Sequence, residues 1–191
     1  MKARTDTDPA PGGFGNSPAS TWLARSGCIA IRATTETDLE MVLQIERDPE
    51  NTAFIAQWPR GRHRDAIHDP AIAHWLVLAE PDWRVVGYLI LLGLGDRHRS
   101  LELTRIVIAE KNRGYGRKAL RLVKREAFER FRAHRLWLDV MEHNHRARHL
   151  YRSEGFVEEA TLRKTVKIDD RFVSLIVLSI LEHEYRSESK A

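Results

Sequence analysis

Residues 106–120 join an apolar strand pattern to a basic amphipathic helix through a turn that contains two glycines. The apolar residues 106–108 are typical of a buried strand, and apolar side chains recur at helical spacing from residue 116 to residue 132. Between them, Gly114 and Gly116 allow the backbone to turn tightly, so consecutive N–H groups converge at the start of the helix. The helix dipole adds positive potential at this end. The run therefore predicts an anion site where a strand meets a helix.

Positive charge is concentrated in the same part of the chain. The chain carries a net charge of +4, whereas Lys111 to Arg135 alone contains ten Lys or Arg and two Glu, a local charge of +8. Arg113, Arg117 and Lys118 lie closest to the turn and suit an anionic group such as a pyrophosphate. Four further basic residues lie along the helix, either on a solvated face or in contact with the nucleotide end of a ligand or with a partner: Lys124, Arg125, Arg130 and Arg132.

Two common nucleotide-binding motifs do not fit this turn. The chain has no G-x-x-x-x-G-K-[ST] sequence, which excludes a P-loop. A dinucleotide-binding fold needs a third glycine, where Ala119 is the nearest small residue. It also needs an acidic residue after the next strand, for which Asp139 is only a loose candidate.

Strand and helix patterns alternate along the rest of the chain. Helices are predicted at about residues 39–47, in one or two short pieces within 50–70, and at 146–154. A turn at Asp169 and Asp170 joins the last two predicted strands. The predicted strands are 28–32, 75–79, 85–92, 100–108, 135–141, 157–167 and 172–181.

Strands that alternate with helices and then close with a hairpin predict a mixed α/β sheet. Within the strand at 100–108, regular alternation places Leu101 and Leu103 on one face. The opposite face then holds Glu102, Thr104 and Ile106. Three roles are open for Glu102. It is a solvent-facing strand residue, one half of an ion pair with Arg105 or with a helix arginine, or a functional carboxylate.

Length and composition fit one domain with a core. The chain has 191 residues, of which 42% are hydrophobic and 30% charged. Residues 1–27 predict a flexible tail, followed by a domain at 28–185 and a C-terminal tail at 186–191. No apolar stretch reaches the roughly 18–20 residues that span a bilayer, and the N-terminus lacks the apolar core of a signal peptide. The single cysteine, Cys28, cannot form an internal disulfide, which favours a cytoplasmic location.

A second motif occupies residues 144–156. On its predicted helix, Ala147 and Tyr151 lie one turn apart on the same face. The preceding strand brings this helix next to the glycine-turn helix, so Tyr151 is either a proton donor near the reactive end of a ligand or a core residue. His145 and His149 have the spacing of a metal-binding pair, but no Glu follows the first His as in zinc proteases. We therefore expect surface or pocket-lining histidines and no metal.

Together the two motifs resemble the GNAT superfamily of acetyl-CoA-dependent N-acetyltransferases, over about residues 28–183. The family's pyrophosphate motif Q/R-x-x-G-x-G/A reads Lys111-Asn112-Arg113-Gly114-Tyr115-Gly116 here, with Lys111 in place of Gln or Arg. Its later signature N-x-x-A-x-x-x-Y-x-x-x-G-F is matched by Asn144, Ala147, Tyr151, Gly155 and Phe156. The resemblance, nearest to the ribosomal-protein and general amine acetyltransferase branches, implies the GNAT fold. That fold is a mixed, largely antiparallel sheet of about six to seven strands, splayed in the middle and flanked by helices.

The resemblance also implies a reaction. Acetyl-CoA, the acyl donor, would pass its acetyl group directly to a primary amine, with no covalent enzyme intermediate and no metal. Tyr151 would protonate the departing thiolate, since its reference pKa of about 10 keeps it protonated at neutral pH. Glu102 is the candidate base, acting through water, because its strand leads into the acetyl site. The residues implied in acetyl-CoA binding are Ile106, Val107, Ile108, Lys111, Asn112, Arg113, Gly114, Tyr115, Gly116, Arg117, Lys118 and Asn144.

Two other functions stay open. A basic module for RNA or a ribosome surface would use the same charge, but the chain lacks the RNP motifs of an RNA-recognition module. Nucleic acid and membrane are therefore not expected as partners. A degenerate GNAT protein would bind acyl-CoA without transferring it. The acceptor, a small-molecule or protein amine, is expected to meet the arginine-rich segment 50–70 and the acidic hairpin turn, and the resemblance allows a homodimer.

Overall fold

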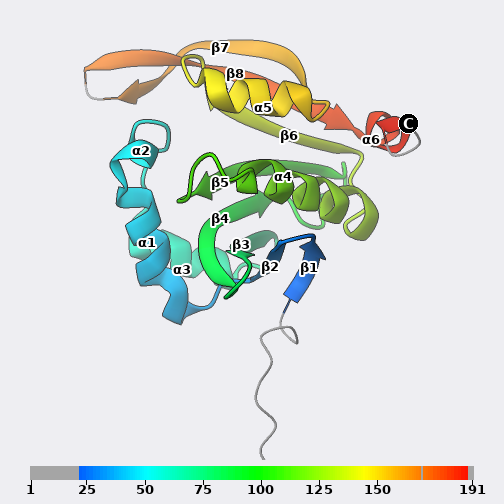
Figure 1. Cartoon of the computed structure of the whole chain (residues 1–191). Coiled ribbons are helices and arrows are strands. Elements are labelled where there is room, and N and C mark those ends of the chain that lie inside the picture. The colour runs from blue at the N-terminus through cyan, green and yellow to red at the C-terminus, as the bar shows by residue number, and fades with distance from the viewer. Residues whose placement is uncertain (1–21, 169, 189–191) are drawn as a thin grey trace, which may run out of the picture.

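The computed structural model describes residues 22–168 and 170–188. Within these residues, eight strands form one sheet in the order β1-β2-β3-β4-β5-β6-β8-β7 (Figure 1). The strands are β1 (Trp22–Ser26), β2 (Ile29–Ala33), β3 (Ile72–Ala79), β4 (Arg84–Leu92), β5 (Ser100–Ile108), β6 (Arg135–Met141), β7 (Val157–Ile168) and β8 (Arg171–Leu181).

Helices cover both faces of the sheet and create two buried apolar clusters within the described residues. One cluster includes Leu120 and Val123 of α4 and Tyr151 of α5, and the other includes Val42 of α1 and Ala66 of α3. The helices are η2 (Glu36–Asp38), α1 (Leu39–Arg47), α2 (Pro49–Thr52), α3 (Arg60–His68), α4 (Tyr115–Arg125), the π-helical turn η3 (Glu126–Arg130), α5 (His145–Ser153) and α6 (Glu182–Glu188). We call the two sides of the sheet the α4–α5 face and the α1–α3 face.

The sheet is splayed between β5 and β6. All neighbouring strands pair antiparallel except these two, which run parallel. Their pairing ends at Glu102 and Trp137, and beyond Glu102 the described residues offer β5 no strand partner on that side. We call residues 103–108 and 138–141 the edges of the β5–β6 gap; Figure 1 shows the two parts of the sheet diverging there. The predicted splayed and largely antiparallel sheet is thus confirmed.

A β-bulge at Thr104 corrects the predicted faces of β5. Two adjacent residues of β4 pair with Leu103 and Arg105, so Thr104 is an extra residue in the ladder. After the bulge, Ile106 returns to the α4–α5 face together with Leu103, because both pack against the same apolar cluster. Glu102 and Arg105 lie on the α1–α3 face. The prediction that Glu102 and Ile106 share a face is wrong, because strict alternation does not allow for an inserted residue.

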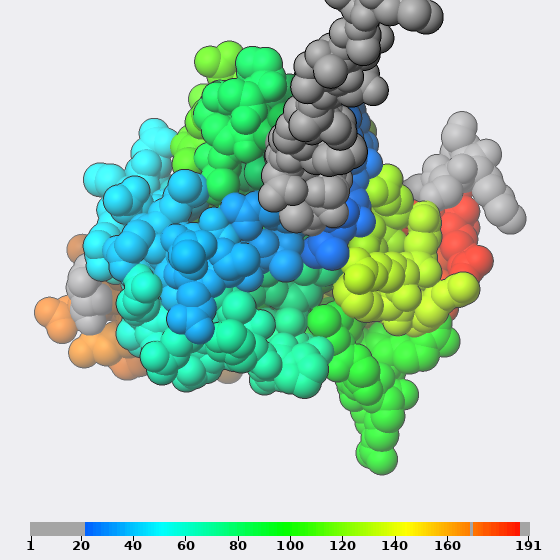
Figure 2. Space-filling model, turned by 90° about the horizontal axis from the view of Figure 1, so that it is seen from below, coloured from blue at the N-terminus to red at the C-terminus, as the bar shows by residue number. Residues whose placement is uncertain are grey.

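The two ends of the chain differ from the predicted tails. Strand β1 lies inside the expected N-terminal tail of residues 1–27 and pairs with β2, which adds an eighth strand to the seven predicted. Figure 2 shows dark-blue β1 against the yellow-green end of α4 and η3, where Arg125 donates to the carbonyl of Arg25. Helix α6 extends past residue 185. The rest of the expected tails, residues 1–21 and 189–191, and Asp169 of the predicted turn lie outside the described residues.

None of the helices in the described ranges has the length and apolar character needed to span a membrane.

Candidate active site

The predicted anion site is a left-handed turn followed by the first turn of α4. Gly114 has a φ of +74° and occupies the N-cap position of α4, and Asn112 has a φ of +60°. These backbone conformations favour glycine and tolerate asparagine. The first helical hydrogen bond runs from the Lys118 N–H to the Gly114 carbonyl at 3.2 Å. The N–H groups of the preceding helical residues have no partner within the helix and suit an anionic ligand.

Gly116 lies where three elements meet. A Cβ placed on it would be 3.7 Å from Ile108 Cγ1, at the end of β5, and 3.8 Å from Leu150 Cδ2 on α5. Both distances are ordinary van der Waals contacts. The turn therefore brings the end of β5 and helix α5 together, as the two sequence motifs predicted.

Three of the predicted cationic side chains have partners within the protein. Lys111 Nζ donates to Asn51 Oδ1 and to the Ile108 carbonyl, and burial lowers the pKa of this amine. Lys118 Nζ lies 2.8 Å from Cys28 Sγ. Arg117 donates to Glu154. Each of these side chains has a partner distant in sequence that the motif does not reveal, and their contribution to the anion site stays a prediction.

Arg113 differs from the other three. Within the described part of the chain it forms no hydrogen bond or ion pair, and it is exposed. Hydrogen bonds from Arg84 are the main cause of the lowered pKa of Glu110, and the charge of Arg113 lowers it further. Arg113 is therefore the predicted cation that stays available to a ligand at the turn.

Glu154 clamps α4 to the end of α5. Its buried carboxylate accepts from Arg117 and, at 2.8 and 2.9 Å, from Arg121, while its carbonyl accepts from Lys124 Nζ at 2.6 Å. Burial alone would raise the pKa of Glu154, but the two guanidinium groups hold it below its usual value. These contacts of Glu154 fix the two motifs relative to one another, and its negative charge neutralises part of the basic face of α4.

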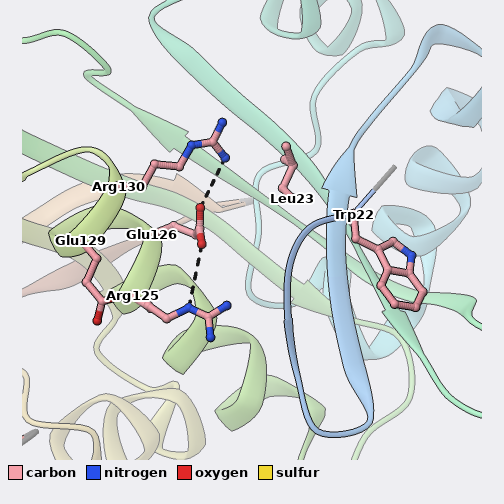
Figure 3. A pocket seen from close by; sticks show the side chains of 6 residues that line it. All are labelled: Trp22, Leu23, Arg125, Glu126, Glu129 and Arg130. Atoms are coloured by element: carbon pink, nitrogen blue, oxygen red, sulfur yellow. Dashed lines mark hydrogen bonds and ion pairs between the residues drawn. The ribbon is translucent and has the colours of Figure 1, made fainter. Parts of the chain in front are cut away.

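The basic residues at the far end of α4 border a shallow pocket of about 480 Å³ beside β1. Figure 3 shows Glu126 between Arg125 and Arg130, with nitrogen–oxygen distances of 3.9 and 3.4 Å. Leu23 and Trp22 of β1 line the other side. These arginines form part of an ion-paired face, so the local charge of +8 is partly balanced within the fold.

Helix α5 carries the second motif. The Asn144 side chain accepts a hydrogen bond from the Ala147 N–H at 3.1 Å and so caps the start of α5. Tyr151, with 7% of its surface exposed, packs in the α4–α5 cluster, and its ring centre is 5.9 Å from that of Phe156. Burial, followed by the negative charge of Asp139, raises the pKa of Tyr151. The phenol is thus protonated at neutral pH.

Two carboxylates lie beside the β5–β6 gap on the α1–α3 face. Glu102 is half-buried, accepts a hydrogen bond from Thr104 Oγ1 at 2.8 Å, and pairs with Trp137 at the last rung before the gap. Burial raises the pKa of Glu102, and the charge of Asp139 raises it further. The predicted pairing of Glu102 with Arg105 is not formed, since Arg105 approaches Glu46 instead.

Asp139 is a candidate site residue that the sequence did not indicate in this role. It lies two positions beyond Trp137 on β6, on the same face, because buried Leu138 and Val140 point to the other one. Protein around the gap removes part of its hydration and raises its pKa, although Arg105 opposes this rise. The alternation of residues 135–141 was a usable signal, but only the pairing of β6 with β5 places Asp139 near Glu102.

The gap therefore has chemically different sides. The phenol of Tyr151 belongs to the α4–α5 face, together with the glycine turn, and the carboxylates of Glu102 and Asp139 belong to the opposite face. Such an arrangement suits a proton donor on one side of a reacting group and a proton acceptor on the other. Within the described residues no group of three or more His, Cys, Asp or Glu side chains could hold a metal ion.

Comparisons with known proteins agree with this geometry. The model of the acetyltransferase (GNAT) family matches residues 39–156. The spermidine N(1)-acetyltransferase of Vibrio cholerae is 29% identical over 170 residues, which cover 85% of this chain and 98% of the relative. The spermidine N(1)-acetyltransferase of Escherichia coli K12 is also 29% identical, covering 85% and 90% of the two chains.

A solved structure shares the fold. The crystal structure of spermidine N-acetyltransferase from Vibrio cholerae in complex with CoA and spermine matches with a TM-score of 0.75 and 24% identity, over 83% of this chain and 98% of that one. The family model spans both sequence motifs. The chain thus belongs to the GNAT acetyltransferase family and is an N-acetyltransferase that uses acetyl-CoA to acetylate an amine.

Proposed function

We propose that this enzyme acetylates a primary amine of a polyamine, and that transfer takes place through the β5–β6 gap. The observation that carries this proposal is the separation of Tyr151 from Glu102 and Asp139 on the two faces of the sheet at the gap. The donor would enter from the α4–α5 face and the amine from the α1–α3 face. Both substrates would then be bound together, with no acyl-enzyme intermediate.

On the donor side, backbone groups would bind acetyl-CoA more than side chains would. The N–H groups at the start of α4 and the guanidinium of Arg113 would hold the pyrophosphate. Residues 103–108 of β5 have no strand partner on the gap side within the described chain, so their backbone groups are available to the pantetheine arm and the thioester carbonyl. Asn144 would contribute indirectly, by fixing the start of α5.

The two proton transfers would fall to Glu102 and Tyr151. The amine nitrogen attacks the thioester carbonyl carbon, the carbon–sulfur bond breaks, and the thiolate takes the proton of the Tyr151 hydroxyl. The proton that the amine loses passes to Glu102 through water. The raised pKa of Glu102 supports its role, because this carboxylate is a stronger base than an ordinary one, and Tyr151 is protonated at neutral pH and so has a proton to give.

A polycationic acceptor is supported by the charges on the α1–α3 face. Glu102 and Asp139 supply negative charge at the gap, whereas two arginines of segment 50–70 have protein partners. Arg60 pairs with Glu40, and the Arg62 guanidinium lies 3.9 Å from the centre of the Trp58 ring. The similarity to spermidine acetyltransferases supports the same class of acceptor. A homodimer, a cytoplasmic location and the domain limits 28–185 stay predictions.

A panel of amines tests the proposal. Purified enzyme with acetyl-CoA is offered spermidine, spermine, putrescine, lysine and a primary amine that has no second charged group. The readouts are free thiol and product mass. We expect the highest kcat/KM with spermidine or spermine and little transfer in the Tyr151→Phe variant. Equal rates with all amines would contradict the polyamine proposal. Binding of acetyl-CoA without transfer to any amine would favour a protein that binds acyl-CoA only.

A further inference from the structure

A chain of polar side chains is buried in the core between the sheet and helices α1 and α3. His74 Nδ1 is 2.9 Å from Thr34 Oγ1, and His63 Nδ1 is 3.0 Å from His74 Nε2. The chain continues to the carboxylate of Glu46. The six buried side chains that take part are Thr34, Glu46, His63, His74, Tyr88 and Arg105. Burying polar groups is costly unless each is satisfied, and the reaction proposed above uses none of them.

Glu46, with 1% of its side chain exposed, is the centre of this chain. Its Oε2 accepts from the Trp58 backbone N–H at 3.0 Å, and Tyr88 donates its hydroxyl proton to Oε1. His63 Nε2 lies 3.3 Å from Oε1. Although burial alone would raise the pKa of Glu46, these neighbours hold it below its usual value. Glu46 is therefore a buried negative charge at neutral pH.

Arg105 balances this charge from β5. Its Nε lies 3.8 Å from Glu46 Oε1, its Nη2 donates to the Ala56 carbonyl, and its guanidinium is 5.0 Å from the centre of the Trp58 ring. The residue is 8% exposed and directly follows the bulge at Thr104, where β5 has already parted from β6. Its positive charge also reaches β6, where it opposes the rise that burial causes in the pKa of Asp139.

Glu46 and Arg105 thus form hydrogen bonds with the backbone of the same irregular stretch of chain. Residues 53–59 form a turn and an extended stretch with no helix or strand, so side-chain contacts determine where they lie. Glu46 holds the backbone N–H of Trp58, and Arg105 holds the carbonyl of Ala56. We call residues 51–58 the bridge segment.

The bridge segment spans from one edge of the gap to the other. On the β5 side, Lys111 Nζ donates to Asn51 Oδ1 and to the carbonyl of Ile108. On the β6 side, the ring centre of Phe54 is 5.7 Å from that of His143, in the turn that follows β6. In Figure 1, α2, where the segment begins, stands at the end of the sheet at which β5 and β6 have separated.

We propose that Glu46 and Arg105 are positioning residues for the acceptor: they hold the bridge segment across the β5–β6 gap as one wall of the acceptor half of the site. This inference rests on the proposed function in taking the α1–α3 face as the acceptor side. It assigns a purpose to the buried charge pair, since a well-packed apolar pair would serve stability equally well. The donor side, on the opposite face, is independent of this contact.

The test is whether substitutions change the KM for the acceptor while the Kd for acetyl-CoA stays the same. In Arg105→Gln, the carbonyl of Ala56 loses its donor, so the KM for spermidine should rise by about tenfold or more. The Kd for acetyl-CoA should stay within about twofold of the parent value. Arg105→Lys keeps the charge and one donor and should recover part of the loss. Glu46→Gln, which weakens the hold on Trp58, should act in the same direction as Arg105→Gln.

Tyr88→Phe is the matched control. Tyr88 donates to the same carboxylate but forms no hydrogen bond with the bridge segment in the described chain. This variant should lower Tm while leaving the KM for spermidine within about twofold of the parent. An equal rise of KM in Tyr88→Phe and Arg105→Gln, or a parallel loss of acetyl-CoA binding, would overturn the positioning role.

Amide hydrogen exchange separates this inference from the proposed function. Residues 53–59 should exchange faster in Arg105→Gln and Glu46→Gln than in the parent, and at the parent rate in Tyr88→Phe. If the parent acetylates no amine, the proposed function fails, and the exchange pattern still decides whether the charge pair holds the bridge segment. Unchanged exchange in both charge variants overturns the inference whatever the activity.

Discussion

Glu102 and Asp139 lie on the same face of two neighbouring strands, on either side of the point where those strands separate. Burial is the main cause of the raised pKa values of Glu102 and Tyr151, and the charge of Asp139 raises both further, although Tyr151 belongs to the opposite face. Asp139 is therefore electrostatically coupled to both groups to which we assign proton transfers. We therefore expect Asp139 to influence the pH range in which the enzyme is active.

Asp139→Asn should move the acid limb of the pH profile of kcat/KM to lower pH. The substitution removes a like charge, so the pKa of Glu102 falls and its unprotonated, basic form persists to lower pH. Glu102→Gln should instead depress turnover most at low pH, where fewer acceptor amines are already neutral. The measurement is the pH–rate profile with one acceptor. Glu142→Gln, an exposed carboxylate after β6, is the control, and an unshifted limb in Asp139→Asn would contradict the coupling.

Tyr151→Phe should lower kcat by roughly 10²–10³, the usual effect of losing a general acid. The ring and its packing against Phe156 remain, so Tm and acetyl-CoA affinity should stay near the parent values. Steady-state kinetics and a thermal melt measure both. Nearly full kcat would rule out the acid role, whereas lost cofactor binding or unfolding would show that the tyrosine is needed for structure.

Gly114→Ala and Gly116→Ala should change stability in opposite directions. Gly114 has a φ of +74°, so alanine there should cost about 1 kcal/mol and weaken acetyl-CoA binding by distorting the turn. Gly116 lies within α4 with no atom closer than 3.7 Å to a new Cβ, so alanine should stabilise the helix by up to about 1 kcal/mol. Denaturant unfolding and titration calorimetry report the two effects. Equal tolerance of alanine at both positions would contradict the left-handed turn.

His74 should make the enzyme less stable in mild acid. Burial, with the neighbouring His63, lowers the pKa of His74 from 6.5 to about 4, so the unfolded chain binds a proton that the folded one does not. Stability should be full above about pH 6.5 and fall as the pH drops toward 4, by at most roughly 1.4 kcal/mol per pH unit.

Unfolding in denaturant at several pH values tests this. His74→Gln should flatten the dependence over this window, while His68→Gln, at an exposed position, should not. A slope that is identical in the parent and His74→Gln would show that other groups cause the acid sensitivity.

Much of the donor side could be read from the sequence because it depends on neighbours along the chain. The glycine turn, the amphipathic pattern of α4 and the short helix α5 are local features, and the structure contains them close to their predicted positions. The signature around Tyr151 likewise covers one helix and the residues at its two ends. Seven strands were predicted from their own residues, whereas β1 was missed, since its five residues are only partly apolar and owe their strand form to pairing with β2.

The positions of the carboxylates at the gap depend on tertiary structure. The bulge at Thr104 sets the face of Glu102, and the parallel pairing of β5 with β6 brings Asp139 beside it. The partners of Lys111 and Arg117 are Asn51 and Glu154, far away in sequence. The sequence therefore indicated the family, the glycine turn and the helix that carries Tyr151, because backbone conformation and helical spacing are local. Strand register, ion-pair partners and the sharing of charge between carboxylates depend on contacts between distant segments, and only the folded chain specifies them.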